Sequence, residues 1–212
     1  VLKFVAFRLS EAGQRGPHMA MVHYRLGQVY ERHFDEPGKA VTSYRRAIED
    51  NPKLLPAIAA ARKIYDAVGN TQAMTALYEL EIEATPAPED KRALLIALAE
   101  MKRHVEDDLD ATIVALRRAL KLGPFDINAL RLLADALIAR AERFGGENAS
   151  VDLRRAAEVL YQVARSVPRS EASGYLVRAL DLHPGHDQAT ALLRELQSYG
   201  SAGAQPQEAQ RE

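Results

Sequence analysis

The histidine pair His183 and His186 is the part of this sequence that comes closest to a metal-binding motif. A zinc site needs three or four nitrogen, sulfur or oxygen ligands held together. Asp187 is the one further ligand nearby, and the chain contains no cysteine. Pro184 and Gly185, which separate the histidines, are typical of a turn. We therefore interpret this segment as a connector between two helices and predict no metal site.

No other arrangement of residues indicates catalysis. The sequence has no glycine-rich phosphate loop, no nucleophile elbow and no helical metalloprotease motif. His23, His33 and His104 are isolated, and the carboxylates lie on predicted helix faces, where ion pairs between residues i and i+4 explain them. The absence of cysteine excludes thiol catalysis and disulfides. We expect no enzyme activity in this chain and no cofactor.

Adjacent arginines could bind phosphate groups of nucleic acid or anionic lipid. They occur as Arg45-Arg46, Arg117-Arg118 and Arg154-Arg155. However, 28 Lys and Arg against 29 Asp and Glu give a formal net charge of −1, so no global field attracts polyanions. Glu49 and Asp50 also neighbour the first pair. We do not expect nucleic-acid or anionic-lipid binding.

The composition indicates a soluble helical protein. Hydrophobic residues make up 47% of the chain and charged residues 27%, whereas aromatic residues make up only 6%. Ala, Leu, Arg and Glu dominate, and these are strong helix formers. No apolar run approaches the roughly 18 residues that a membrane span needs. The lack of cysteine suits the cytoplasm and the periplasm alike, and we favour the cytoplasm.

Prolines follow several of the amphipathic segments. They follow amphipathic segments at positions 52, 86, 124, 168 and 184, and the first two lie 34 residues apart. The first interval carries small and aromatic residues in a characteristic order: Tyr24, Leu26, Gly27, Tyr30, Ala40, Tyr44, Ala47 and Pro52. This period and these residues resemble the tetratricopeptide repeat (TPR) family. Physically, Gly27 and Ala40 permit two antiparallel helices to approach closely, and the tyrosines fill the space around them.

The pattern continues with decreasing fidelity along the chain. We expect repeat units at about 20–53, 54–87, 92–125 and 127–168. The second unit departs from the family at Arg62, Met74 and Glu81, where small residues are usual. Met74 can fill an irregular gap, whereas Glu81 must reach water or a partner.

The ends of the chain fit the repeat less well. We predict a helix over 1–18, which is either separate or the end of a preceding repeat. Residues 145–148 are predicted to form a loop. Helices are predicted at about 151–166, 170–182 and 186–198, with 175–184 reading like a second helix and the last one acting as a cap; the pairing of helices after residue 145 is left open. Residues 200–212 are predicted to be a flexible tail.

The resemblance, over residues 19–199, implies an all-α fold, a right-handed α-solenoid of stacked antiparallel helix pairs in a TPR-like superhelix. A single compact helical bundle is the structural alternative. Because the sequence begins at Val1 rather than methionine, we expect a fragment or a processed product.

In this family the first helix of each pair lines a concave groove that binds partners. Carried over position by position, the resemblance implies these groove residues: Tyr24, Gln28, Glu31, Arg32, Lys63, Asp66, Glu100, Arg103, Arg131 and Asp135. Their mixed charge suits a segment that carries both signs. Tyr24 and Gln28 stand where family members that grip a C-terminal carboxylate have Lys or Arg and Asn, which disfavours such a ligand. Arg131 with Asn128 matches only partly.

We therefore expect a non-catalytic adaptor or scaffold that binds a peptide or protein segment. The alternative is a substrate-recruiting or regulatory domain of a larger enzyme whose catalytic domain lies outside this chain. Self-association through the end helices is a third possibility, because an uncapped repeat end exposes apolar surface.

Overall fold

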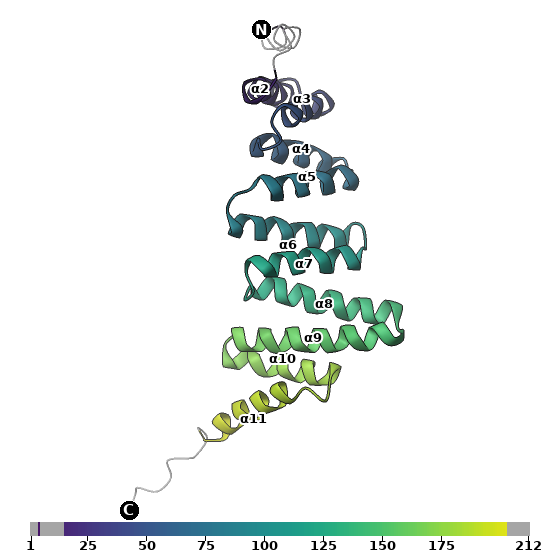
Figure 1. Cartoon of the computed structure of the whole chain (residues 1–212), viewed down its shortest axis with the longest axis vertical. Coiled ribbons are helices and arrows are strands. Elements are labelled where there is room, and N and C mark those ends of the chain that lie inside the picture. Colours follow the sequence, from purple (N-terminus) through teal and green to yellow (C-terminus); the bar gives the residue numbers. More distant parts are fainter. Residues whose placement is uncertain (1–3, 5–14, 203–212) are drawn as a thin grey trace, which may run out of the picture. The chain divides into compact units, whose positions relative to one another are not determined.

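The computed structural model describes residue 4 and residues 15–202, and every regular element within them is an α-helix (Figure 1). The chain divides at Leu98 and Ala99 into two compact units. In the described part, the extensive contacts join helices that are consecutive in the chain. The predicted all-α fold of antiparallel helix pairs is confirmed. None of the described helices has the length and hydrophobicity that crossing a bilayer requires.

The first unit contains two complete helix pairs and the beginning of a third. Its helices are α2 (Pro17–His33), α3 (Pro37–Asp50), α4 (Leu55–Ala67), α5 (Thr71–Ala84) and the first part of α6 (Pro88–His104). One apolar core runs through α2 to α5, from Met19 to Leu77, and includes the fully buried Tyr44 and Ile58. Neither pair buries its apolar face alone, so stacking of the pairs builds the core.

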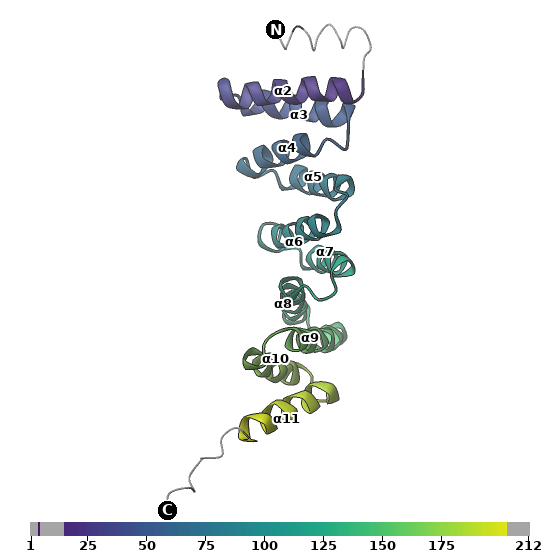
Figure 2. The same cartoon turned by 90° about the vertical axis from the view of Figure 1, so that its left-hand side faces the viewer.

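The second unit contains the rest of α6 followed by five helices. These are α7 (Leu109–Leu122), α8 (Ile127–Phe144), α9 (Gly146–Ser166), α10 (Arg169–Leu182) and α11 (Asp187–Ala202). Figure 2 shows α8, α9 and α10 as successive neighbours. A second apolar core joins Ala134 of α8 to Leu160 of α9, Leu176 of α10 and Ala189 of α11.

Local sequence fixes where the helices begin. A proline occupies the first or second position of α2, α3 and α4, where its missing N–H costs nothing. Other helices are capped by side chains: Asn70 accepts a hydrogen bond from the N–H of Ala73, and Asp126 accepts one from Ala129. Such caps contribute about 1 kcal/mol each.

The turn inside each of the first four pairs needs a residue with positive φ. These residues are Asp35 (49°), Gly69 (69°), Asp107 (53°) and Gly145 (59°). The left-handed conformation ends a helix and reverses the chain within a few residues. The first helices therefore end at a defined place, which positions every side chain along them.

Two of our predictions for the C-terminal half are wrong. The loop predicted at 145–148 is reduced to Gly145, because α9 already begins at Gly146. The φ angle of Gly146 is positive (70°). The last helix does not stop before Gly200 but continues to Ala202; residues 203–212 of the predicted tail lie outside the described residues.

The pairing left open after residue 145 follows from the helix order. Counted from α2, α10 is the first helix of a fifth pair and α11 is the second, although residues 175–184 read like a second helix. Of the predicted N-terminal helix over 1–18, residues 1–3 and 5–14 lie outside the described residues; Phe4 is helical, Arg15 and Gly16 are not, and Pro17 and His18 begin α2. The division into repeat units stays a prediction.

Candidate protein-binding surfaces

The first helix pair is packed through a glycine. A Cβ atom added at Gly27 of α2 would lie 2.4 Å from Cε1 of Tyr44 on α3, closer than any side chain tolerates. Tyr44 is fully buried, and its hydroxyl donates a hydrogen bond of 2.6 Å to the carboxylate of Glu31. Burial, and then this hydrogen bond, raise the pKa of Tyr44. Glu31, a predicted groove residue, is therefore held in place by the core.

Two other predicted groove residues lie on the same face of α2. The Gln28 side chain donates a hydrogen bond of 3.0 Å to the hydroxyl of Tyr24, and the Tyr24 ring lies 5.8 Å from the Tyr44 ring. All three of Tyr24, Gln28 and Glu31 are partly exposed, and Arg32 is exposed. The structure thus brings Tyr24, Gln28 and Glu31 together as a polar surface, with the exposed Arg32 on the same helix.

The second helix pair is packed through an ion pair instead. Arg62 of α4 donates hydrogen bonds to the carboxylate of Glu81 (2.8 Å) and to the hydroxyl of Tyr78 (3.1 Å), both on α5. The Arg62 guanidinium carbon also lies 4.4 Å from the centre of the Tyr78 ring. Glu81, which needs water or a partner, finds its partner in Arg62. Two of the three departures from the repeat pattern therefore satisfy each other.

A pocket of about 740 Å³ opens beside this ion pair. It lies between α4 and α6, with α5 behind, entirely within the first unit. The lining residues are Leu55, Pro56, Ala59, Arg62, Tyr78, Glu81, Thr85, Pro86, Asp90, Ala93, Leu94 and Ala97. The predicted groove residues Lys63 and Asp66 are not among them; both are exposed farther along α4. Sequence reasoning missed this pocket, although the opposite charges at Arg62 and Glu81 were its signal.

The predicted groove residues of α6 are Glu100 and Arg103. Glu100 is exposed and Arg103 is partly buried. Within the part of the chain that the structure describes, neither residue forms an ion pair, and the same holds for Lys63 and Asp66 of α4. Their charges are therefore available to a partner.

The predicted residues of α8 meet three residues of α10. The Arg131 guanidinium lies 3.4 Å from the Glu171 carboxylate, and Asp135 accepts a hydrogen bond of 2.9 Å from Arg178. Arg131 also lies 5.1 Å from the centre of the Tyr175 ring. We call these five residues the α8–α10 face. Glu171, Tyr175 and Arg178 were missed from the sequence because the pairing of α10 was open.

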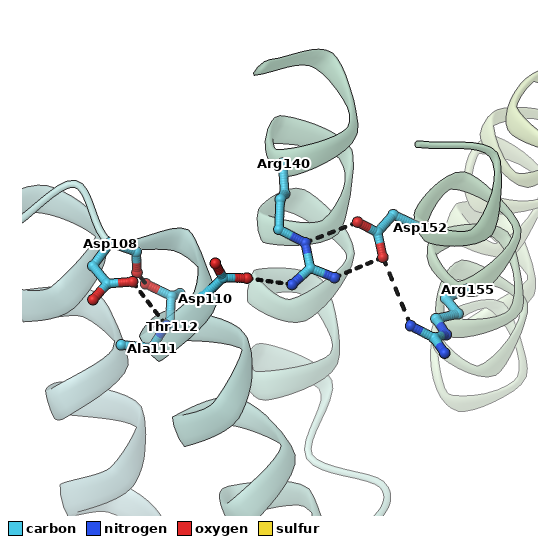
Figure 3. Close-up of polar contacts among 7 residues, drawn as sticks. All are labelled: Asp108, Asp110, Ala111, Thr112, Arg140, Asp152 and Arg155. Carbon is cyan, nitrogen blue, oxygen red and sulfur yellow. Dashed lines mark hydrogen bonds and ion pairs between the residues drawn. The ribbon is translucent and has the colours of Figure 1, made fainter. Parts of the chain in front are cut away.

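A second polar network in the same unit is structural rather than exposed for binding. Figure 3 shows the Arg140 guanidinium of α8 between Asp110 of α7 and Asp152 of α9. Two hydrogen bonds of 2.8 and 2.7 Å join Arg140 to Asp152, whose side chain is only 6% exposed. The hydrogen bonds to Asp152, more than those to Asp110, raise the pKa of Arg140. The Arg140–Asp152 pair is satisfied and largely buried, so it fixes α8 against α9, and the exposed Asp110 adds a link to α7.

The histidine turn is a helix connector. His183 follows the last residue of α10, and the Nδ1 atom of His186 accepts a hydrogen bond of 3.2 Å from the N–H of Ala189, in the first turn of α11. The Nε2 atom of His186 lies 3.3 Å from the Glu158 carboxylate. No group of three potential ligands in the described residues could hold a metal ion.

The arginine pairs lie on second helices, α3, α7 and α9. Arg45 and Arg46 are exposed, as is Arg117, whereas Arg155 lies 3.8 Å from Asp152. These residues therefore share no helix with the predicted groove. That the chain does not bind nucleic acid stays an untested prediction.

Comparisons with known proteins support the fold and nothing finer. No protein-family model and no curated protein matches this sequence. Solved structures of TPR proteins do match over most of the chain. YrrB, described as a TPR protein with an unusual peptide-binding site, is 18% identical to this chain. The match covers 82% of this chain and 92% of the YrrB chain, with a TM-score of 0.41.

Two further structures give the same picture. MamA is 16% identical and covers 84% of this chain and 96% of its own, with a TM-score of 0.46. The C-terminal part of a TPR repeat-containing protein from Cytophaga hutchinsonii is 14% identical and covers 85% of this chain and 74% of its own, also with a TM-score of 0.46. This chain is similar to these proteins in its succession of helix pairs. Because the identities and the TM-scores are low, no residue role is carried over from these proteins.

Proposed function

We propose that this TPR chain is a non-catalytic interaction module that holds a segment of another protein against its first helices. The observation that carries the proposal is the α8–α10 face. Two ion pairs join α8 and α10 there. In one, Arg131 of α8 pairs with Glu171 of α10; in the other, Arg178 of α10 pairs with Asp135 of α8. Tyr175 lies between Glu171 and Arg178 on α10, and its ring is near Arg131. The face comes from two first helices, as the resemblance implies for a groove.

The solvent exposure of these ion pairs supports a role in binding rather than in the stability of the fold. The side chains of Arg131 and Glu171 are 43% and 54% exposed, and those of Arg178 and Asp135 are 49% and 38% exposed. Ion pairs this open to water contribute about 0–1 kcal/mol to folding, since solvent screens them. Their charges can be exchanged for charges of a partner at little cost. A neighbouring tyrosine supplies apolar contact area with a hydrogen-bonding tip.

The chemistry of the face favours an extended or helical segment that carries both charges. A uniformly acidic segment would meet Asp135 and Glu171, and a uniformly basic one would meet Arg131 and Arg178. The alternative function, recruitment of substrates for a catalytic domain outside this chain, uses the same surface and stays a prediction.

A charge-reversal variant tests the proposal. Dodecapeptides selected from a displayed random library by the full chain serve as the probe. The double variant Arg131→Glu with Arg178→Glu is expected to bind the selected peptides at least about tenfold more weakly, because both cations of the face are reversed. Arg117→Glu, an exposed change on a second helix, is the matched control and is expected to leave affinity unchanged.

Circular dichroism of both variants checks that the helices are intact. Equal affinity of the double variant and the wild type would reject the α8–α10 face as the binding surface. A library that yields no binding peptide would reject peptide binding itself.

A further inference from the structure

The residues of α4 and α6 that face each other across the pocket beside Arg62 are mostly small or aliphatic. Leu55 and Ala59 lie one helical turn apart on α4, and Ala93 and Ala97 do so on α6, with Leu94 between them. Both walls belong to first helices, as the proposed binding surface does. Small and aliphatic side chains on facing helices leave room and offer apolar contact.

The polar groups at the back of the pocket are already paired. Arg62 donates to Glu81 and Tyr78, and the hydroxyl of the buried Thr85 donates to the backbone carbonyl of Glu81 at 2.7 Å. Opposite charges cancel in the Arg62–Glu81 pair, and only Asp90, which is exposed, adds a net charge. A charged ligand group would lose its hydration here without gaining an unpaired opposite charge.

The size of the pocket fits a side chain together with the backbone that carries it. Its volume of about 740 Å³ exceeds that of one side chain and lies within the range of about 300–1,000 Å³ typical of ligand sites. Arg62 keeps three of its five N–H donors outside the two hydrogen bonds to α5. A peptide carbonyl group can accept from one of these donors while an apolar side chain fills the space between α4 and α6.

From these observations we infer that the Arg62 pocket takes an uncharged apolar side chain, of leucine to phenylalanine size, from the bound protein segment. The inference rests on the proposed function and adds a specificity that the mixed-charge face does not provide. It follows from the ion pair that replaces two small residues of the repeat, Arg62 on α4 and Glu81 on α5. The pocket therefore selects for one residue type in the partner.

The test fills the pocket without changing the core. Ala93 is exposed on α6, so Ala93→Trp puts a large ring at the pocket mouth with little effect on folding, and Ala76→Trp on α5 is the matched control because Ala76 is exposed outside the pocket. The full chain and both variants are measured against dodecapeptides selected by the wild type. If Ala93→Trp loses helicity, Ala93→Lys replaces it and puts a charge into the apolar wall.

We expect the selected peptides to share one apolar position, and replacing that residue by glutamate to weaken binding at least about tenfold. Ala93→Trp should weaken binding of the parent peptide by a similar factor, and Ala76→Trp should not.

Two results would overturn the inference. One is equal affinity of Ala93→Trp and the wild type; the other is a charged residue at the shared position. If the Arg131→Glu and Arg178→Glu variant loses binding while Ala93→Trp keeps it, the proposed function stands and the pocket assignment fails. If no peptide is selected at all, both fail together.

Discussion

The first and second helix pairs differ in the residues that pack between their two helices. In the α2–α3 pair, Gly27 leaves room for the ring of Tyr44, which is fully buried. In the α4–α5 pair, Arg62 and Glu81 stand where small residues are usual and bond to each other across the helices. The long charged pair of α4 and α5 has a pocket beside it.

The difference shows how a repeat acquires specificity. In the α2–α3 pair, the close approach at Gly27 leaves no space between Gly27 and the Tyr44 ring. A pair built on an ion pair keeps two long side chains extended between helices, and neighbouring α6 then closes one wall of a cavity. Departures from the repeat pattern thus mark the places where the chain can differ from other repeats in function.

The largest expected effect breaks the tight pair. Gly27→Val should lower the free energy of unfolding by about 3 kcal/mol, because the buried Tyr44 ring cannot move away from the added carbon atoms. Gly38→Val on α3 is the control, since nothing lies within 4 Å of a Cβ there. Urea denaturation measures both. Equal stability of the two variants would contradict the close approach at Gly27.

A smaller effect is expected in the second pair. Arg62→Met should cost about 2 kcal/mol because it leaves the Glu81 carboxylate buried without its partner; breaking a fully buried pair costs roughly 3–5 kcal/mol, but the Arg62 side chain is 25% exposed. Adding Glu81→Leu should recover most of the loss, because two apolar residues can replace a buried ion pair. A double-mutant cycle by urea denaturation gives the coupling. Additive losses from the two substitutions would mean that the pair is not formed.

The smallest effect distinguishes the two pairs by pH. Burial lowers the pKa of His23 on α2 from 6.5, against the opposing attraction of Asp50 at 3.8 Å and of Glu49, and Arg46 lowers it further. On acidification the unfolded chain therefore takes up this proton before the folded chain does. Stability contributed by neutral His23 is present above pH 6.5 and is lost as the pH falls through 6.5 towards the lower folded-state pKa.

Segment-resolved hydrogen exchange measures this difference. The α2–α3 pair should exchange faster as the pH falls below 6.5, after correction for the intrinsic rate, whereas the α4–α5 pair has no histidine between residues 55 and 84. His23→Gln should remove most of the pH dependence of α2–α3. A pH dependence that survives this substitution would assign the effect to another group.

Much of the fold could be predicted from residue types. Prolines, glycines and alanines at fixed intervals carry the helix pairs, because each acts locally on helix ends or on close packing. The loop predicted at 145–148 is wrong, since Gly145, with positive φ, ends α8 and Gly146 already begins α9. A glycine run reads as a loop when the conformation of each glycine is unknown.

The candidate sites could be predicted only in part. The resemblance to the TPR family implied Tyr24, Gln28 and Glu31 as groove residues, and they do share one face of α2. In contrast, Arg62 and Glu81 are 19 residues apart and each looks unfavourable by itself; only their contact explains them. The partners of Arg131 and Asp135 lie 40 and 43 residues farther along the chain, on a helix whose pairing the sequence leaves open. Contacts over such separations depend on tertiary packing rather than on local pattern.

The most direct test of the central claim, that the first helices hold the partner, is hydrogen exchange of the full chain with and without a selected dodecapeptide. We expect slower exchange in α8 and α10 for a peptide that the α8–α10 face binds, and in α4 and α6 for a peptide that the pocket binds. The second helices α3, α7 and α9 should be unchanged. Protection confined to those second helices, or no protection at saturating peptide, would contradict the account.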